Sequence, residues 1–299
     1  MKKFTLILTI VVLVLLFLSL IPLLFFNKAE LNKIAVVKIN GVITSDGDGG
    51  SFLTGSFGVS SSEIVKQIKE LKDDNSVKGV ILEINSPGGE VVASQEIGEA
   101  IKSLNKTKYA VIREVGASGG YWAASATDKI FASPVSITGS IGVLGSYLEF
   151  SKLFEKYGID YERFVGGKYK DLGSAFKDLN EEERKLLQGK INIIHDYFIE
   201  EVSNNRKLDK EYVKKLATGE FYLGKEAKEL KLIDEFGNKE KAIEEMKKEL
   251  KLEHAEIFEV ERKVGFLQLL SEFTSYNFGR GFASEIFKLE NENRLKIKI

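Results

Sequence analysis

The pattern that most limits the possible folds is an alternation of apolar, strand-like runs with helix-like segments through the first half of the chain. Strand-like runs at residues 34–43, 79–84 and 108–115 are separated by segments whose apolar residues recur at helical spacing. Such alternation is typical of α/β proteins, in which right-handed crossover helices connect parallel strands. We therefore predict a mostly parallel sheet with crossover helices, extended by a strand at residues 129–132.

The rest of the chain predicts further elements. Residues 45–62 are rich in Gly, Ser and Asp and are predicted to form a surface loop, after which Ser61 or Ser62 caps a helix. Asn180 is predicted to cap a long helix that ends near Arg206. The remaining predictions are a helical segment at 148–157, a short strand at 161–165, a loop at 166–175 and short helices at 210–217, 225–230 and 239–250.

One serine stands out because it lies at a strand-to-helix turn built from small residues. The strand at 108–115 runs into G-A-S-G-G at 116–120, with Ser118 at its centre, and a short helix is predicted at 121–126. Small residues permit unusual backbone angles and leave room near the hydroxyl, and amides at a helix N-terminus can stabilise a developing negative charge. The same letters also fit a glycine-rich bend that only packs a helix on a sheet, so the turn alone leaves both interpretations open.

A second glycine-rich turn, S-P-G-G at 86–89, follows the buried-type strand at 79–84 and precedes another helix. Two such turns on one parallel sheet open at the same edge, where the strands have their carboxyl ends. Gly88 or Gly89 is therefore predicted to lie near Ser118. Backbone amides from this turn, together with the amide after the serine, are the donors that an oxyanion hole requires.

A serine nucleophile requires a base, and the chain offers few of the usual ones. It has no cysteine and two histidines: His195 lies within the predicted long helix beside apolar residues, which favours packing, and His254 lies in a charged segment. The same composition argues against a metal site built from histidines or cysteines. Lysine is the remaining common base, provided that its surroundings lower its pKa from about 10.4 toward about 7. Lys129, Lys168 and Lys170 are the candidates, because they lie in short segments near glycine-rich turns.

Four motifs occur in order along the chain: N-S-P-G-G at 85–89, G-A-S-G-G-Y at 116–121, T-G-S-I-G at 138–142 and G-K-Y-K-D at 167–171. Together they resemble the signal peptide peptidase A family, in its short, single-repeat form, from residue 34 to about residue 250. That family is related to the Clp protease and crotonase folds. The resemblance implies an α/β fold of this type and a serine endopeptidase that needs no cofactor or metal.

The resemblance also implies a role for each motif. Ser118 would be the nucleophile and Lys170 its general base. Ser140 would hydrogen-bond Lys170 and hold its amine toward the serine. The amides of Gly89 and Gly119 would form the oxyanion hole.

Two features distinguish this chain from proteins to which it is similar. The family commonly has a proline soon after the K-D pair, whereas this chain has Ser174-Ala175-Phe176. Clp proteases use a histidine about one helix after the serine, but no histidine lies between Ser118 and His195. A serine–lysine dyad is therefore favoured over the Clp type of site.

Residues 137–144 are rich in glycine and β-branched residues and are predicted to bind an extended substrate as an added strand. The candidate substrate-binding residues are Ile137, Gly139, Ile141 and Gly142. The resemblance implies that the substrates are remnant signal peptides, or similar extended apolar peptides, left in the membrane after secretion. It also implies a ring- or dome-shaped homo-oligomer, such as an octamer, with active sites shared between subunits.

Residues 4–26 form an almost unbroken apolar run that is long enough to cross a bilayer. The run is longer than the apolar part of a secretory signal peptide and lacks a small-residue cleavage site, so an uncleaved anchor is favoured over a cleaved signal. Lys2 and Lys3 predict a cytoplasmic N-terminus. We therefore predict a single-pass protein of the cell membrane whose catalytic domain lies outside the cytoplasm.

Three parts of the chain follow from these predictions. Residues 1–28 are the cytoplasmic tip and transmembrane anchor, residues 29–262 the peptidase domain, and residues 263–299 an apolar tail. The tail is too interrupted to span a bilayer, and packing on a neighbouring subunit is favoured over a position at the membrane interface. The net charge of −1 gives no indication of a nucleic-acid partner.

Three functions compete at this point. The first is an anchored serine–lysine peptidase that degrades remnant signal peptides, or a membrane quality-control peptidase with broader substrates. The second is a crotonase-fold enzyme that acts on acyl-thioesters, which would have no use for Ser118. The third is a non-catalytic membrane scaffold that has kept the fold. The four motifs favour the first.

Overall fold

The computed structural model describes residues 14–15, 32–46 and 58–260. Within these ranges, no helix combines the length and the apolar character needed to cross a bilayer. The predicted anchor lies outside the described residues apart from Val14 and Leu15. The same holds for the predicted apolar tail at 263–299 and for residues 47–57 of the predicted surface loop.

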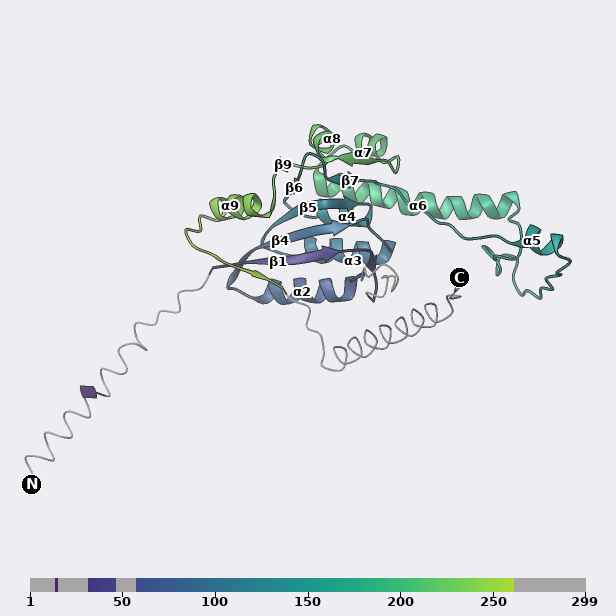
Figure 1. Ribbon diagram of the computed structural model, residues 1–299, viewed down its shortest axis with the longest axis horizontal. Helices are drawn as coiled ribbons and strands as arrows, with labels where there is room; N and C mark the ends of the chain where they lie inside the picture. Colours follow the sequence, from purple (N-terminus) through teal and green to yellow (C-terminus); the bar gives the residue numbers. More distant parts are fainter. Residues whose placement is uncertain (1–13, 16–31, 47–57, 261–299) are drawn as a thin grey trace, which may run out of the picture. The chain divides into compact units, whose positions relative to one another are not determined.

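A mostly parallel sheet forms the centre of the fold, as the alternation of strands and helices predicts (Figure 1). Neighbouring strands along its main path, β10-β1-β4-β5-β6-β9, are all parallel. Strand β4 is almost continuously buried, as expected for a central strand with both faces covered. The strands of this path are β1 (Lys33–Asn40), β4 (Val77–Ser86), β5 (Thr107–Ala117), β6 (Lys129–Ala132), β9 (Glu235–Phe236) and β10 (Glu256–Glu259).

Strand β5 is long enough to pair with two successive strands on one side. Its first half pairs with β6, and its last three residues, 115–117, pair in parallel with β7 (Ile137–Gly139). Strand β7 then pairs with β8 (Phe221–Leu223), which is the one antiparallel pair among the described strands. A separate two-stranded sheet joins β2 (Ile43–Thr44) to β3 (Val59–Ser60). The carboxyl end of β5 therefore lies between β4 and β7.

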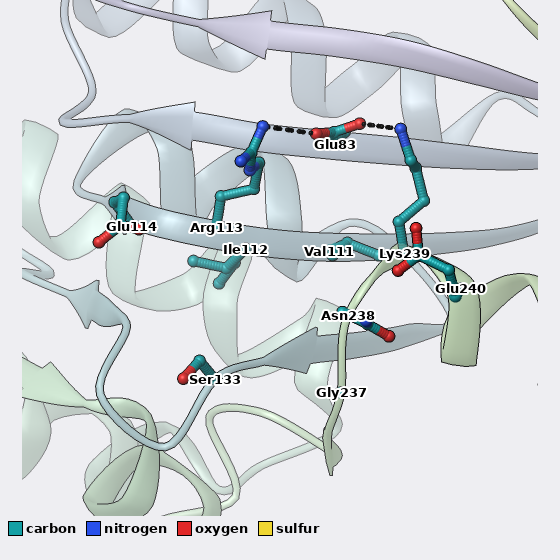
Figure 2. Close-up of a pocket in the computed structure, with 10 residues that line it drawn as sticks. All are labelled: Glu83, Val111, Ile112, Arg113, Glu114, Ser133, Gly237, Asn238, Lys239 and Glu240. Carbon is teal, nitrogen blue, oxygen red and sulfur yellow. Dashed lines mark hydrogen bonds and ion pairs between the residues drawn. The ribbon is translucent and has the colours of Figure 1, made fainter.

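Helix α9 (Lys239–Glu249) covers one face of the sheet and packs its apolar side chains on the first halves of the strands. Beyond this helix the face is polar. The buried carboxylate of Glu83 lies between Arg113, at 3.2 Å, and Lys239, at 3.0 Å, beside a cavity of about 340 Å³ (Figure 2). Positive charges on both sides balance this carboxylate, which explains how a glutamate can lie in a buried strand.

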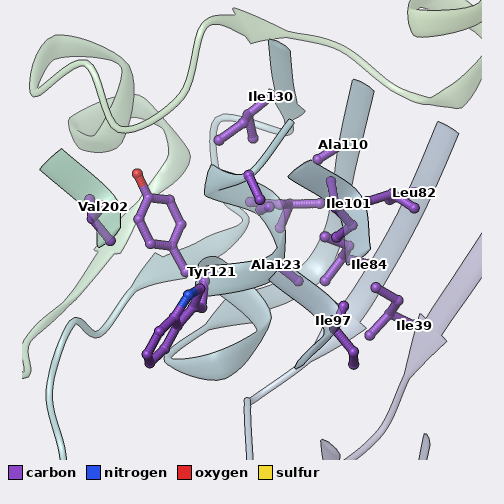
Figure 3. Packing of buried hydrophobic residues seen from close by; sticks show 14 of the residues in the cluster. Ile39, Leu82, Ile84, Ile97, Ile101, Ala110, Tyr121, Ala123, Ile130 and Val202 are labelled. Atoms are coloured by element: carbon purple, nitrogen blue, oxygen red, sulfur yellow. The ribbon is translucent and has the colours of Figure 1, made fainter. Parts of the chain in front are cut away.

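The main hydrophobic core lies on the opposite face of the sheet. Figure 3 shows Leu82 and Ile84 of β4 in the same cluster as Ile97 and Ile101 of the helix that crosses them, with Tyr121 from the helix after the serine turn. Alternate strand residues thus serve the two faces, as a pleated strand requires. Helices α2 (Ser61–Asp73), α3 (Val91–Lys102) and α4 (Gly119–Ser125) contribute to this cluster, and later helices of the chain add to it.

Helix caps follow the sequence signals closely. Helix α6 (Glu181–Arg206) begins with a capping box: the Asn180 side chain accepts the Glu183 amide at 2.9 Å, and the Glu183 carboxylate accepts the Asn180 amide at 3.1 Å. This cap and the end of the helix agree with the prediction. Helix α2 begins earlier than predicted, because the hydroxyl of Ser60 accepts the Glu63 amide at 3.3 Å and provides the cap.

Several short elements differ from the predictions. The predicted strand at 161–165 is wrong: these residues are exposed and irregular, and none of the described strands pairs with their backbone. Strands β8, β9 and β10 have two to four residues each and are not among the predicted elements. The predicted short helices near 210, 225 and 239 are confirmed, the first two being α7 (Lys210–Leu216) and α8 (Gly224–Glu229).

Residues 145–179, called the arm below, run from the sheet to the amino-terminal end of α6, and the arm includes α5 (Ser151–Lys156) (Figure 1). Many large apolar side chains of the arm are exposed, among them Phe164 at 96% and Leu148 at 73%. By contrast, Phe198 and Val202 in the second half of α6 are buried in the core. Monomeric soluble proteins rarely expose large contiguous apolar surface, so the exposed side chains of the arm need an explanation.

We expect Phe198→Ala to lower the free energy of unfolding by about 3–5 kcal/mol, because the Phe198 ring is buried and stacks on that of Trp122 with centroids 4.5 Å apart. Chemical denaturation followed by circular dichroism measures the change. The control Lys190→Ala alters an exposed residue of the same helix and is expected to change this free energy by less than about 0.5 kcal/mol. Equal effects of the two substitutions would contradict the packing described here.

Candidate active site

The two glycine-rich turns meet at the carboxyl edge of the sheet. A Cβ atom on Gly88 would lie 2.6 Å from the amide nitrogen of Gly119 and 2.8 Å from the Cβ of Ser118. Gly88 also has a φ of +97°, which residues with a side chain rarely adopt. Both the contact and the backbone angle therefore require glycine, and the S-P-G-G turn lies beside the serine as predicted.

Ser118 has a strained backbone, with φ 51° and ψ −121°. Its amide donates a hydrogen bond of 2.8 Å to the carbonyl of Gly139 in β7, and helix α4 begins at the next residue. A serine held in such a strand-to-helix turn has the geometry of a nucleophile elbow, in which the surrounding structure supports strain of about 1–3 kcal/mol. This context favours a nucleophile over a simple bend.

Ser140 is brought to the same place by the pairing of β5 with β7. Ala117 pairs with Gly139, so Ser118 and Ser140 each follow a paired residue. Ser140 also has a positive φ, 50°, and its hydroxyl donates a hydrogen bond of 3.1 Å to the carbonyl of Gly219. Because that bond uses the hydroxyl hydrogen, the lone pairs of the oxygen remain to accept a hydrogen bond from an amine.

Gly89 is held by strand β2 through its neighbours. Ile43 donates to the Gly88 carbonyl and accepts from the Glu90 amide, both at 2.9 Å, so this bridge does not use the amide of Gly89. A Cβ atom on Gly89 would lie 1.9 Å from the Ile43 carbonyl oxygen, which excludes any other residue. Gly89 and Gly119 both line the cavity of the serine. Two amides beside one serine are the arrangement that an oxyanion hole requires.

A cavity of about 140 Å³ opens beside the serine. Small residues of the two turns form one part of it, and apolar side chains, including the stacked rings of Trp122 and Phe198, form the other. Sequence reasoning did not single out these rings, because their helical spacing is that of ordinary core residues. A cavity of this size holds an apolar group about as large as benzene. The lining residues are Gly89, Val91, Ser94, Ser118, Gly119, Trp122, Gly142, Val143, Leu144 and Phe198.

The segment predicted to bind substrate as an added strand is only partly available. Ile137 and Gly139 belong to β7, whose edges are occupied by β5 and β8, so no further strand can pair there. The Ile141 carbonyl accepts a hydrogen bond from the loop before β8 and lies 3.3 Å from Nε2 of His195. Of the four candidates, Gly142 is the one that lines the cavity. Residues 142–144 are therefore the part of this segment left for an extended peptide.

Lys170 is exposed on the arm and is not among the residues that line the serine cavity. Its loop lies beside the first turn of α6, where Lys168 is 2.7 Å from Glu182. The cavity is instead lined by Phe198 of the same helix. The separation between these two helix positions is about 24 Å at 1.5 Å per residue. Within one chain, the structure does not bring the amine of Lys170 to the hydroxyl of Ser118.

The partners and positions of the other basic side chains do not favour a role as the general base. Lys129 pairs with Glu249 at 3.1 Å on the α9 side of the sheet, and His254 is exposed. Hydrogen bonding to Glu182 raises the pKa of Lys168 above its ordinary value, which is opposite to what a base requires. Within the part of the chain that the structure describes, no group of three or more potential ligands could hold a metal ion.

Two family patterns match the chain. That of peptidase family S49 matches residues 100–253, and that of Clp protease matches residues 52–137. A protein of Enterococcus faecium named signal peptide peptidase SppA is 38% identical over 77% of this chain and 67% of its own length. A protein of Methanocaldococcus jannaschii named as a protease is 36% identical over 77% of this chain and 75% of its own length. The chloroplastic serine protease SPPA of Arabidopsis thaliana is 31% identical over 71% of this chain and 32% of its own length.

The chain therefore belongs to peptidase family S49. It is a serine peptidase with a mostly parallel α/β fold related to that of Clp protease. The predicted family resemblance is confirmed. Membership of a peptidase family argues against the two other functions, the acyl-thioester enzyme and the non-catalytic scaffold.

We expect Gly88→Ala to reduce peptide hydrolysis at least about 100-fold, because the added Cβ would displace the amides beside the serine, and losing one oxyanion donor has an effect of this order. Gly189→Ala is the control and is expected to keep the activity, since a Cβ there would meet nothing within 4 Å and Gly189 lies outside the arm. Steady-state cleavage of a fluorogenic peptide measures both variants. An active Gly88→Ala protein would show that the close contact of the turns is not needed.

Proposed function

We propose that Ser118 is the nucleophile of this peptidase and that the amides of Gly89 and Gly119 form its oxyanion hole. The contact between Gly88 and the serine turn carries this proposal, because it holds both amides beside a serine with a strained backbone. Donors fixed in this way need no rearrangement when charge develops on the substrate oxygen, which is the condition for efficient electrostatic stabilisation.

Lys170 of a second copy of the chain is the proposed general base. The lysine is separated from the serine of its own chain by most of the length of α6, so a neighbour has to supply it. Ser140 accepts a hydrogen bond from the incoming amine and directs it toward Ser118. The exposed apolar side chains of the arm, Leu148 and Phe164 among them, are covered by the neighbouring copy in this arrangement.

A contact in which the arm of one copy reaches the serine of the next is head-to-tail. Such contacts close into a ring when the rotation between subunits allows it. The active enzyme is therefore proposed to be a ring- or dome-shaped homo-oligomer, such as an octamer. The apolar tail at 263–299 is proposed as a further subunit contact.

The proposed reaction is acyl transfer from a peptide to Ser118 and then to water. The neutral amine of Lys170 takes the hydroxyl proton as the serine oxygen attacks the peptide carbonyl, and the two amides hold the oxyanion. Collapse of the tetrahedral intermediate breaks the peptide bond, and protonated Lys170 gives its proton to the departing amine. Water then repeats the sequence on the acyl-enzyme and releases the carboxylic acid.

The proposed substrates are extended apolar peptides, in particular signal peptides that remain in the membrane after secretion. The apolar walls of the serine cavity, with Trp122 and Phe198, support this choice, as does the name of the Enterococcus faecium relative. The apolar run at residues 4–26 would anchor the enzyme in the cell membrane, with a cytoplasmic N-terminus and the catalytic domain on the other side. A quality-control peptidase with broader membrane substrates is the alternative.

Mixing two inactive variants tests the shared site. Ser118→Ala and Lys170→Ala are each expected to be inactive alone, because each removes one member of every dyad. After dissociation and reassembly of an equal mixture, we expect about one quarter of the sites to combine an intact serine with an intact lysine from different copies. Peptide hydrolysis and labelling of Ser118 by a serine-reactive fluorophosphonate measure the recovery.

Reassembly is checked with subunits that carry two different fluorescent labels. If mixed particles form and remain inactive, the dyad is not shared between copies. If Lys170→Ala alone is fully active, Lys170 is not the base.

A defined peptide set tests the substrate class. The full chain in detergent is expected to cleave synthetic signal peptides with a higher kcat/KM than length-matched peptides in which the apolar residues are replaced by serine, because the serine cavity is walled by apolar side chains. Cleavage sites are read by mass spectrometry. Equal rates for the two sets would contradict a preference for apolar substrates.

A further inference from the structure

Four charged side chains, called the arm cluster below, fasten the Lys170 loop to helix α6. Arg163 and Lys177 lie on either side of the Asp171 carboxylate, at 2.9 and 3.1 Å, and Lys177 continues to Glu183 at 2.6 Å. Three of the four are largely withdrawn from solvent, with side-chain exposures of 14% for Asp171, 17% for Lys177 and 4% for Glu183. The cluster contains two positive and two negative charges and is therefore balanced.

The cluster is joined to the backbone at both ends. Glu183 is also the capping-box residue of α6, so one of its oxygens holds Lys177 while the other holds the amide of Asn180. Asp171 directly follows Lys170 and belongs to a series of tight turns, in which the amide of Lys170 donates to the Gly167 carbonyl at 3.1 Å. The arm cluster thus connects the Lys170 loop to the first turn of helix α6.

Exposed ion pairs nearby are a useful contrast. Lys168 and Glu182 also join the loop to α6, but their side chains are 65% and 56% exposed. Exposed pairs contribute little because water screens them and long side chains lose entropy. Breaking a buried pair is far more disruptive, since it leaves an uncompensated charge away from water. Because three of its four side chains are largely withdrawn from water, the arm cluster holds the position of the loop more firmly than the exposed pair does.

Both carboxylates of the cluster remain ionised at neutral pH. Burial alone would raise the pKa of Asp171, but the hydrogen bond from Lys177 and the charge of Arg163 outweigh it and lower this pKa below its ordinary value. The hydrogen bond from Lys177, together with that from the Asn180 backbone, lowers the pKa of Glu183. Without Lys177, two carboxylates would face each other with no positive charge between them.

We propose that Asp171, Lys177 and Glu183 are positioning residues. They hold the Lys170 loop against the first turn of α6, so that the Lys170 amine reaches the serine site of the next copy. This inference rests on the proposed function, in which Lys170 acts on a neighbouring subunit. A base must lie within hydrogen-bond reach of the proton it removes, and a displacement of about 1 Å can lower the rate on the order of 100-fold. None of the four residues of the arm cluster is among the described residues that line the serine cavity, so its effect on the reaction acts through the neighbouring Lys170.

Mixed assemblies separate this role from a general effect on folding. In a mixture of Ser118→Ala and Lys170→Ala copies, every active site takes its lysine from the first variant and its serine from the second. Lys177→Met is added to one variant at a time. On the Ser118→Ala copy it alters the arm that supplies the lysine, whereas on the Lys170→Ala copy it alters an arm without that lysine.

We expect the first combination to lower kcat at least about 100-fold relative to the unmodified mixture, with KM little changed. The second combination is expected to stay within about twofold of that mixture, since its substitution lies far from the intact serine. Asp178→Asn is the matched control: it removes an exposed carboxylate of the same arm, 63% exposed and 3.8 Å from Lys152, and should have no effect on either copy.

Equal losses in the two combinations would overturn the inference, because the substitution would then act on the whole particle. If Lys177→Met prevents co-assembly, the isosteric Asp171→Asn takes its place and has to show the same asymmetry; a symmetric effect would again overturn it. An inactive but properly assembled mixture of the two parent variants would instead contradict the shared dyad of the proposed function.

Discussion

The structure depends on the direct contact between two backbone turns, with no side chain between them. Gly88 lies so close to Gly119 and Ser118 that even one methyl group would overlap them. A parallel sheet makes this contact possible, because neighbouring strands β4 and β5 end at the same edge. Each is followed by a helix that packs on the same face of the sheet. Ile43 of strand β2 holds the S-P-G-G turn in place through hydrogen bonds with Gly88 and Glu90. The strained turn of Ser118, the amides beside it and the cavity all follow from this arrangement.

Much of this arrangement could be predicted from the sequence, for identifiable reasons. Strands such as β4 and helices such as α6 are long, so their apolar period and caps decide their structure locally. Strands β8, β9 and β10 are too short for any period and form only because a neighbouring strand is present. At 161–165, apolar and aromatic letters predict a strand, but none of the described strands pairs with these residues. Tertiary context, which the local sequence does not contain, decides these cases.

Some features of the candidate site could likewise be predicted from the sequence, and others depend on tertiary context. The family resemblance, rather than spacing, points to Ser140, which the pairing of β5 with β7 brings beside Ser118. Motif spacing correctly places the two glycine-rich turns together, since both follow strands of one sheet. It says nothing about which strand edges are already occupied, and β8 covers the part of β7 predicted to bind substrate. Nor can spacing reveal that α6 stands between Lys170 and the serine, because the loop is close in sequence to the site and separated from it by the rigid length of a helix.

The order of strands in the sheet joins the beginning of the domain to its end. Strand β1, near the start of the domain, has β4 on one side and β10, the last described strand, on the other. A chain whose synthesis has not reached residue 259 leaves the outer backbone groups of residues 33–36 in β1 without this partner strand. Strand β10 can therefore join the sheet only after nearly the whole domain has been synthesised. Until then the growing chain needs protection against pairing with other chains.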